Sequence, residues 1–240
     1  MHMDESAPLF GPLLPSVVLS AEMPPLAADP ARLLDTEARC VERAVDKRRR
    51  EFAAGRVLAR DLFARIGLDP SQRAVPLLND ADRVPVWPAG VVGSITHCSS
   101  LCAVAIASAR HSAGIGLDVE PAEPLKTELE PQILRAGDAA CLHGLPQHAR
   151  HLGGVLTFSI KEAVYKAIYP TYRRFLDFHE VGLTQIALES ASSADLRGSF
   201  EVLVHTPDAA PPGRPRIAGR FRIASGHIAA AVVLPPLPGA

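Results

Sequence analysis

The sequence predicts a mixed α/β (α+β) protein made of two similar halves that meet near residue 112. Two observations lead to this fold class. Each half contains one segment with helical periodicity, and each contains several strand-like runs separated by turn residues. No letter-by-letter repeat accompanies this order of elements. We therefore expect one half in residues 1–112, with the long helix, and the other in residues 113–240.

The elements of the first half follow from periodicity and turn residues. In residues 36–66 apolar side chains recur at intervals of three, four and seven, which predicts one continuous helix. Gly67 and Pro70 then supply a stop signal. The strand-like runs of this half, rich in Val, Ile and Ala, are residues 16–21, 91–96 and 102–108.

The second half combines short helices with more strands. Residues 123–154 are interrupted by Pro and Gly, which predicts loops and short helices. Residues 158–168 predict a helix that stops at Pro170, because Pro cannot donate a helical hydrogen bond. The pair Ser225-Gly226 predicts a hairpin turn. The strand-like runs are residues 114–120, 183–188, 198–204, 216–223 and 227–234.

Charge and hydropathy argue against several classes of function. The 25 Lys+Arg and 26 Asp+Glu give a net charge of -1, so we expect no nucleic-acid partner held by bulk charge. No apolar run approaches the roughly 20 residues that span a bilayer, and we expect no membrane association. The first 30 residues carry acids and prolines instead of a signal peptide's positive charge, which predicts a cytoplasmic protein. The phosphate-binding patterns GxxxxGK[ST] and GxGxxG do not occur in the sequence.

Four acidic and basic residues occur at spacings that would bring them together. Asp118 and Glu120 lie two apart on a predicted strand and therefore share one face, which suits a hard cation such as Mg2+. Glu162 and Lys166 lie four apart and share one face of a predicted helix. By themselves these pairs also fit a solvated strand end and an ordinary surface ion pair.

Two further groups could bind an anion. Thr96 and His97 end a predicted strand in GSITHC, where a hydroxyl and a ring N–H can donate hydrogen bonds. Arg48 and Arg56 are eight residues apart, so they lie within roughly 80° of one another over two helical turns. Guanidinium groups so placed can bind separated phosphates. By itself each group also fits a structural histidine or a solvated basic face.

Taken together, these segments resemble the Sfp-type phosphopantetheinyl transferases, most closely the branch with enterobactin synthetase component D and actinobacterial relatives. The resemblance lies in RRREFAAGRVLAR, WPAGVVGSITHC, GIGLDVEP and FSIKEAVYKA, which fall between Arg48 and Phe178. It implies a pseudo-twofold fold with the active site between the halves. It also implies a Mg2+-dependent enzyme that moves the phosphopantetheine arm of coenzyme A to a serine of an apo acyl or peptidyl carrier protein and releases 3',5'-ADP.

The resemblance also implies roles for individual residues. A carrier of siderophore, polyketide or nonribosomal peptide biosynthesis is the implied partner, and a monomer the implied state. Thr96 stands where the family more often has Ser, and Leu117 where it more often has Ile; both changes are mild. The implied sites are Asp118, Glu120 and Glu162 for Mg2+, with Glu162 also as general base; Lys161 and Lys166 near the phosphates; Thr96 and His97 on the 3'-phosphate; and Arg48, Arg56 and Arg83 at the nucleotide end.

Two other functions remain open at this level. The same acids could serve a Mg2+-dependent nucleotide pyrophosphohydrolase. Alternatively, the chain could be a module that binds a carrier protein without catalysing a reaction.

Overall fold

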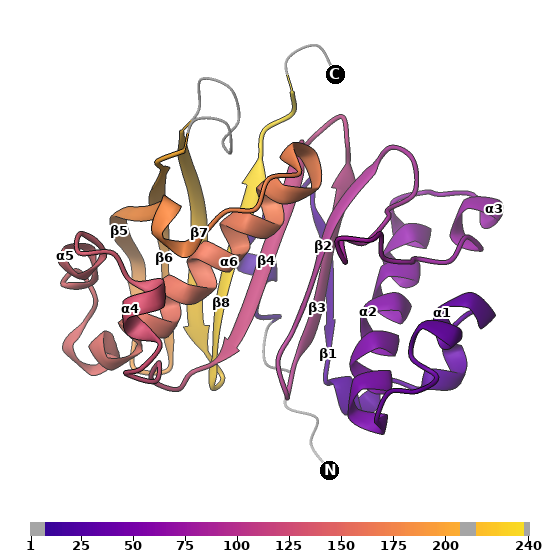
Figure 1. Cartoon of the computed structure of the whole chain (residues 1–240), viewed down its shortest axis with the longest axis horizontal. Coiled ribbons are helices and arrows are strands. Elements are labelled where there is room, and N and C mark those ends of the chain that lie inside the picture. Colours follow the sequence, from indigo (N-terminus) through magenta and orange to yellow (C-terminus); the bar gives the residue numbers. More distant parts are fainter. Residues whose placement is uncertain (1–7, 207–214, 238–240) are drawn as a thin grey trace.

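Two antiparallel sheets, each carrying one 20-residue helix, form the molecule (Figure 1). The computed structural model describes residues 8–206 and 215–237. The smaller sheet has the order β1-β3-β2 and the larger has the order β4-β8-β7-β6-β5. The mixed α/β class is thus confirmed, in its α+β form. The strands are β1 (Leu19–Met23), β2 (Val91–His97), β3 (Cys102–Ser108), β4 (Gly114–Pro121), β5 (Val181–Ala191), β6 (Asp195–Val204), β7 (Arg216–Ala224) and β8 (His227–Leu234).

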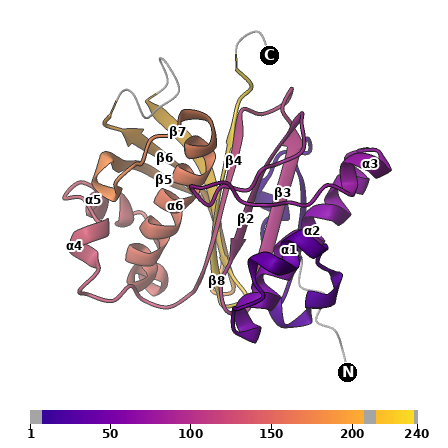
Figure 2. The ribbon, with the colours of Figure 1, turned by 45° about the vertical axis from the view of Figure 1, so that its right-hand side comes forward.

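Two long helices and several short ones accompany the sheets. In Figures 1 and 2, β2 and β4 lie between the long helices α2 and α6. The segment expected to hold short helices does so. The helices are α1 (Asp35–Cys40), α2 (Asp46–Arg65), α3 (Pro70–Arg73), α4 (Glu130–Ile133), α5 (Asp138–Leu142) and α6 (Gly153–Tyr172), with 3-10 turns at Gly11–Leu13, Pro25–Ala27, Pro30–Arg32, Gln147–Leu152 and Phe178–Glu180. Within the described part of the chain, no helix is both long and apolar enough to cross a bilayer.

Three apolar cores hold these layers together. Alternate residues of β3 point to opposite faces, so Cys102, Val104 and Ile106 pack against α2, and the intervening alanines face the second sheet. A separate core lies between α6 and the five-stranded sheet. The third core lies between the two sheets, on the faces that point away from α2 and α6. It includes Leu117 and Val119 of β4. Both residues are fully buried, as expected from their alternation with acidic neighbours.

The prediction of one helix over residues 36–66 was wrong, because the chain turns between α1 and α2. Glu37 of α1 is fully buried, and its carboxylate accepts from Arg60 of α2 at 2.8 Å. These two residues are 23 positions apart, which on one straight helix would separate them by about 35 Å. The ion pair therefore requires the break, and local periodicity carries no information about it.

Helix α6 continues past the predicted stop at Pro170 and ends at Tyr172. Pro170 removes one N–H from the last turn, and the N–H of Arg173 still bonds the Tyr169 carbonyl at 2.8 Å. Arg173 ends the helix in a left-handed conformation, with φ 52°. The predicted hairpin turn at Ser225-Gly226 is confirmed, since both residues have positive φ between β7 and β8.

Glycines in β4 allow α6 to approach the sheet closely. A Cβ at Gly116 would collide with the backbone carbonyl of Ala163, and one at Gly114 with that of Ala167. Because Asp118 and Glu120 follow at the same two-residue spacing, they share this face of β4. The close packing therefore brings the acids of the strand next to the side chains of α6.

Candidate active site

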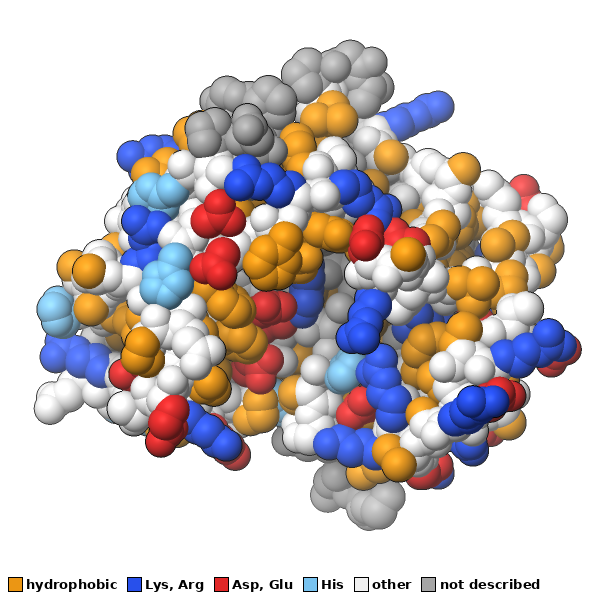
Figure 3. Space-filling model, viewed as in Figure 1, with side chains coloured by type: hydrophobic (Ala, Val, Ile, Leu, Met, Phe, Trp, Pro, Cys, Tyr) orange, Lys and Arg blue, Asp and Glu red, His pale blue; other side chains and the backbone are white. Residues whose placement is uncertain are grey.

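A cavity of about 460 Å³ lies between the two halves. Its walls come from α2, from the segment before β2, from β2 itself and from α6. Figure 3 shows this face hollowed at its centre, with acidic and basic side chains on both sides of the hollow. Lys166 accompanies Glu162 on the α6 side, and Glu51 and Asp82 accompany the arginines and the histidine on the other side. Six predicted site residues line the cavity: Arg48, Arg56, Arg83, His97, Glu162 and Lys166.

On the acidic side, Glu162 and Lys166 of α6 line the cavity. Asp118 and Glu120 of β4 are not among its lining residues, although Asp118 contacts Lys166. Lys166 Nζ donates to Asp118 Oδ1 at 2.6 Å and lies 4.0 Å from a Glu162 oxygen. Burial and, to a smaller extent, the charge of Asp118 together raise the pKa of Glu120 to about 7. Burial likewise raises the pKa of Glu162, and the charge of Lys166 offsets part of this increase. These carboxyl groups are therefore crowded and short of positive charge.

The carboxyl groups fit a hard cation such as Mg2+. Asp118 Oδ2 is buried and has no hydrogen-bond partner among the described residues. A buried, unpartnered carboxylate oxygen beside a carboxyl group of raised pKa suits an oxygen-binding metal ion. Within the described ranges, however, no three His, Cys, Asp or Glu side chains are already arranged around a metal position. In this arrangement Lys166 occupies the other oxygen of Asp118.

The basic side is built from α2 and the end of β2. Arg48 Nη1 lies 3.1 Å from His97 Nε2 and 3.5 Å from Glu51 Oε2. Because a guanidinium can only donate, His97 Nε2 must accept, which requires the neutral ring. Burial lowers the pKa of His97, and the charges of Arg48 and Lys166 lower it further, while Glu51 raises it. The predicted pair Arg48 and His97 thus forms one cluster with Glu51.

The other two predicted arginines differ in how they are held. Arg56 is 5% exposed, donates to the Leu77 carbonyl and to Asn79 Oδ1, and stacks 3.6 Å from the centre of the Phe52 ring. Burial lowers its pKa to about 10, so it stays charged near neutral pH. Arg83 lines the cavity, and its guanidinium has no hydrogen-bond or ion-pair partner among the described residues. The Arg83 guanidinium is therefore available to bind a ligand, whereas the Arg56 guanidinium is already held by groups of the protein.

Thr96 does not line the cavity. Its side chain is buried, and Oγ1 accepts a hydrogen bond from the backbone N–H of Val119 at 3.2 Å. Ser94, two positions earlier, accepts from Leu117 N at 3.0 Å in the same way. These hydroxyls join β2 to β4 and so connect the two sheets. The predicted contact of Thr96 with a 3'-phosphate receives no support from this placement.

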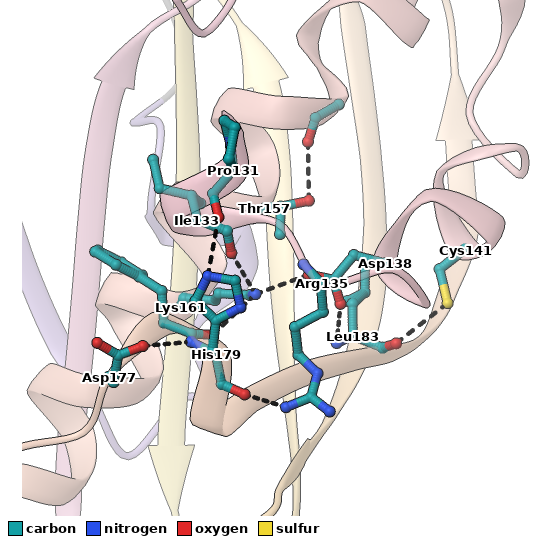
Figure 4. Close-up of polar contacts among 12 residues, drawn as sticks. Pro131, Ile133, Arg135, Asp138, Cys141, Thr157, Lys161, Asp177, His179 and Leu183 are labelled. Atoms are coloured by element: carbon teal, nitrogen blue, oxygen red, sulfur yellow. Dashed lines mark hydrogen bonds and ion pairs between the residues drawn. The ribbon is translucent and has the colours of Figure 1, made fainter. Parts of the chain in front are cut away.

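Lys161 also points away from the cavity, into a buried polar network of the C-terminal half (Figure 4). Its Nζ donates to Asp138 Oδ2 and to the Ile133 carbonyl, each at 2.7 Å, and to the Phe178 carbonyl at 3.0 Å. Both side chains of the Lys161–Asp138 pair are 1% exposed. All three ammonium protons are used in these bonds, so the predicted place near the substrate phosphates is not where this structure puts Lys161.

The predicted site did not include Tyr165, Tyr169 and Glu51, which also line the cavity. Tyr165 and Tyr169 line the cavity beside Glu162 and Lys166, because spacings of three and four keep all of them on one face of α6. Glu51 lies three positions after Arg48 on α2, which places it next to that arginine. Helical spacing could have identified all three.

Comparisons with known proteins agree on one family. A model described as the 4'-phosphopantetheinyl transferase N-terminal domain matches residues 36–107, and one described as the 4'-phosphopantetheinyl transferase superfamily matches residues 114–217. The 4'-phosphopantetheinyl transferase Svp of Streptomyces mobaraensis is 41% identical over 157 residues, which cover 65% of this chain and 62% of that protein.

Two other relatives align over a greater length. The 4'-phosphopantetheinyl transferase Npt of Nocardia iowensis is 35% identical over 230 residues, or 92% of this chain and 97% of the relative. The 4'-phosphopantetheinyl transferase PptT of Mycobacterium tuberculosis is 30% identical over 213 residues, or 87% and 90%. The chain therefore spans less than two thirds of the Streptomyces protein but nearly all of the other two.

Proposed function

The chain belongs to the 4'-phosphopantetheinyl transferase superfamily, and we propose that it moves the phosphopantetheine arm of coenzyme A to a serine of a carrier protein in the cavity between its sheets. In this reaction the serine oxygen forms a bond to the phosphorus that bears pantetheine. The pyrophosphate P–O bond breaks, and 3',5'-ADP leaves. The alternatives are the nucleotide pyrophosphohydrolase and the carrier-binding module without activity.

One observation carries the proposal: Glu162 and Lys166 on one wall of the cavity face arginines and a histidine on the other. Coenzyme A carries a pyrophosphate and a 3'-phosphate, which need positive charge at two separated places. Arg48, His97 and Arg83 offer donors on one side of the cavity, and Lys166 offers an ammonium on the other. The separation of these donor groups suits a ligand with phosphates at both positions.

We further propose that the enzyme uses Mg2+ held by Asp118, Glu120 and Glu162. When bound, Mg2+ supplies charge neutralisation at the pyrophosphate. Lys166 would stabilise the charge that develops on the leaving 3',5'-ADP. Glu162 would accept the proton of the carrier serine, and its raised pKa suits a general base that works near neutral pH.

Incubation with coenzyme A, Mg2+ and a panel of apo carriers tests this function. Intact-mass measurement should show a carrier that has gained the phosphopantetheine group, and digestion should place the group on a serine. Cleavage of coenzyme A without modification of any carrier would instead mean a hydrolase. Carrier binding without either reaction would mean a non-catalytic module. Ranking the carriers by kcat/KM would identify the class of synthase that is served.

Two substitutions test the acidic site. Asp118→Asn keeps the shape of the side chain and removes its charge, so turnover and the response to Mg2+ should both fall. Glu162→Gln should abolish turnover even at saturating Mg2+, because it also removes the proposed base. Asp61→Asn is the matched control, since Asp61 is an exposed partner of Arg32 at 3.9 Å. Full recovery of Glu162→Gln in excess Mg2+ would leave Glu162 as a ligand only.

Three broader predictions accompany this function. We expect a monomer, a cytoplasmic location, and a functional division of the chain at residues 112 and 113. Size-exclusion chromatography with light scattering measures the first, and cell fractionation measures the second. The division would be tested by expressing residues 1–112 and 113–240 separately and assaying coenzyme A binding by each.

A further inference from the structure

The loop before β2 forms part of the cavity wall and is tightly folded. Asn79 and Pro85 form an isolated antiparallel bridge, and the N–H of Asp80 bonds the Val84 carbonyl at 2.9 Å. The tip of the loop carries Arg83, which lines the cavity. The position of the Arg83 guanidinium therefore depends on how this loop is held.

Asp80 organises the loop from within. Its Oδ1 accepts from the N–H of Asp82 at 3.0 Å and from the N–H of Val84 at 2.9 Å. Between them, Arg83 has φ 66°, in the left-handed region that non-glycine residues seldom adopt. Such a conformation persists only where the surroundings impose it. The Asp80 carboxylate supplies two of the bonds that do so.

The second oxygen of Asp80 reaches the other half of the molecule. Arg173, at the end of α6, donates from Nη1 to Asp80 Oδ2 at 2.5 Å and lies 3.5 Å from Asp82 Oδ2. Its guanidinium also lies 5.9 Å from the centre of the Tyr169 ring. Tyr169 and Asp82 both line the cavity, so this bridge joins its two walls.

We propose that Arg173 is a positioning residue that latches the loop of residues 79–85 to α6 and thereby fixes Arg83 toward the phosphates of coenzyme A. This inference rests on the proposed function for the identity of the ligand. Arg173 itself does not line the cavity. It acts through Asp80. The carboxylate of Asp80 accepts the hydrogen bonds that hold the strained loop and also pairs with Arg173.

The effect should be modest, because Arg173 is 47% exposed and Asp80 is 24% exposed. Exposed ion pairs contribute little free energy. Because Arg173 bridges two acids of the loop, we expect its contribution to lie at the upper end of the range for exposed pairs. We therefore expect KM for coenzyme A to rise about fivefold in Arg173→Gln, with kcat changed much less. Arg173→Lys keeps the charge and should restore most of the loss.

The matched control is Arg174→Gln. Arg174 is the next residue along, and it pairs with Glu180 at 3.3 Å instead of with the loop. Circular dichroism melts should show that all three variants fold. Hydrogen exchange without ligand then measures how firmly Arg173 holds the loop. The amides of Asp82 and Val84 should exchange faster in Arg173→Gln than in wild type or in Arg174→Gln.

A double-substitution cycle tests whether Arg173 acts through Arg83. If it does, Arg173→Gln should add no further increase in KM to a protein that already carries Arg83→Gln. Additive effects of the two substitutions would overturn the proposed route through Arg83. Unchanged loop exchange in Arg173→Gln would overturn the latch itself. If wild type bound no coenzyme A, the proposed function would fail, and exchange alone would still decide whether the latch exists.

Discussion

At the residue scale, the titratable side chains around the cavity interact with one another before any ligand arrives. Arg48 donates to His97 Nε2, which keeps that ring neutral, and burial lowers the pKa of the ring. On the other wall Lys166 pairs with Asp118, while the pKa of Glu120 rises to about 7 because the site is buried and acidic. Ligand binding should therefore change protonation on both walls.

For His97, the pKa shift predicts proton uptake on binding of coenzyme A. A phosphate dianion favours the protonated ring, so binding should raise the pKa of His97, and affinity should increase as pH falls toward 6.5. Calorimetry at pH 7 in two buffers of different ionisation enthalpy measures the uptake. His97→Asn should remove it and raise KM for coenzyme A more than it lowers kcat. His111→Asn, at an exposed position outside the cavity, is the control.

The lowered pKa of His97 also determines how the stability of the fold changes with pH. The fold lowers the pKa of His97 below 6.5, so the unfolded chain binds more protons in the window just below that value. The contribution of His97 to stability is present above pH 6.5 and is lost as pH falls through the lowered pKa. An unchanged pH dependence of unfolding in His97→Asn would contradict this assignment.

Lys161 is predicted to stabilise the fold without binding substrate. Lys161→Met leaves Asp138 buried without its partner, which should cost about 3–5 kcal/mol of unfolding free energy. Thermal melts measure this loss, and Lys126→Met at an exposed position is the control. KM for coenzyme A should stay unchanged at temperatures where the variant is folded. A large rise in KM with no loss of stability would instead place Lys161 near the phosphates.

At the scale of elements, the contact between β4 and α6 positions the acidic wall. Gly114 and Gly116 present no side chain to α6, so the helix backbone lies directly on the strand. The ion pair between Lys166 and Asp118, at 2.6 Å, depends on that approach. The four residues Gly114, Gly116, Asp118 and Glu120 therefore form one functional face: two glycines for the approach and two acids for the chemistry.

Gly116→Ala should weaken both the fold and the site. Its Cβ would meet the Ala163 carbonyl, so α6 must move away, at a cost of about 1–3 kcal/mol. Turnover should fall as well, because Lys166 moves away from Asp118. Gly137→Ala is the control, since a Cβ there meets nothing within 4 Å. A Gly116→Ala protein with wild-type stability and rate would show that the close contact is not required.

At the scale of the whole molecule, two sheets share one apolar core and are joined by hydroxyl groups of β2. Ser94 and Thr96 accept from backbone N–H groups of β4, so side chains here replace part of a strand-to-strand ladder. The cavity takes its basic wall from one sheet's half and its acidic wall from the other. The cavity therefore lies at the junction of the two halves.

Thr96→Val tests this connection between the sheets. The change leaves the buried Val119 N–H without an acceptor, which should cost about 1–3 kcal/mol. Thr96→Ser keeps the acceptor and should retain most of the stability. If Thr96 connects the sheets, the melting temperature falls and KM for coenzyme A changes little. If Thr96 instead binds the 3'-phosphate, as the family resemblance implies, KM rises while stability is retained.

Features that depend on local spacing could be predicted from the sequence. Two-residue alternation placed Asp118 and Glu120 on one face of a strand, with Leu117 and Val119 buried on the other. Helical spacing placed Glu162 beside Lys166. Turn chemistry identified the last hairpin, whose central residues adopt positive φ. Backbone geometry fixes each of these relations within a few residues, so no distant contact is needed.

The directions of side chains whose partners are far away in the chain could not be predicted and became known from the fold. Lys161 neighbours Glu162 in sequence, but its ammonium is held by Asp138, 23 positions earlier. The turn between α1 and α2 depends on the pair of the buried Glu37 and the half-buried Arg60. A buried charge must be paired, and the residue that pairs with it is set by packing between distant segments, which local periodicity does not record.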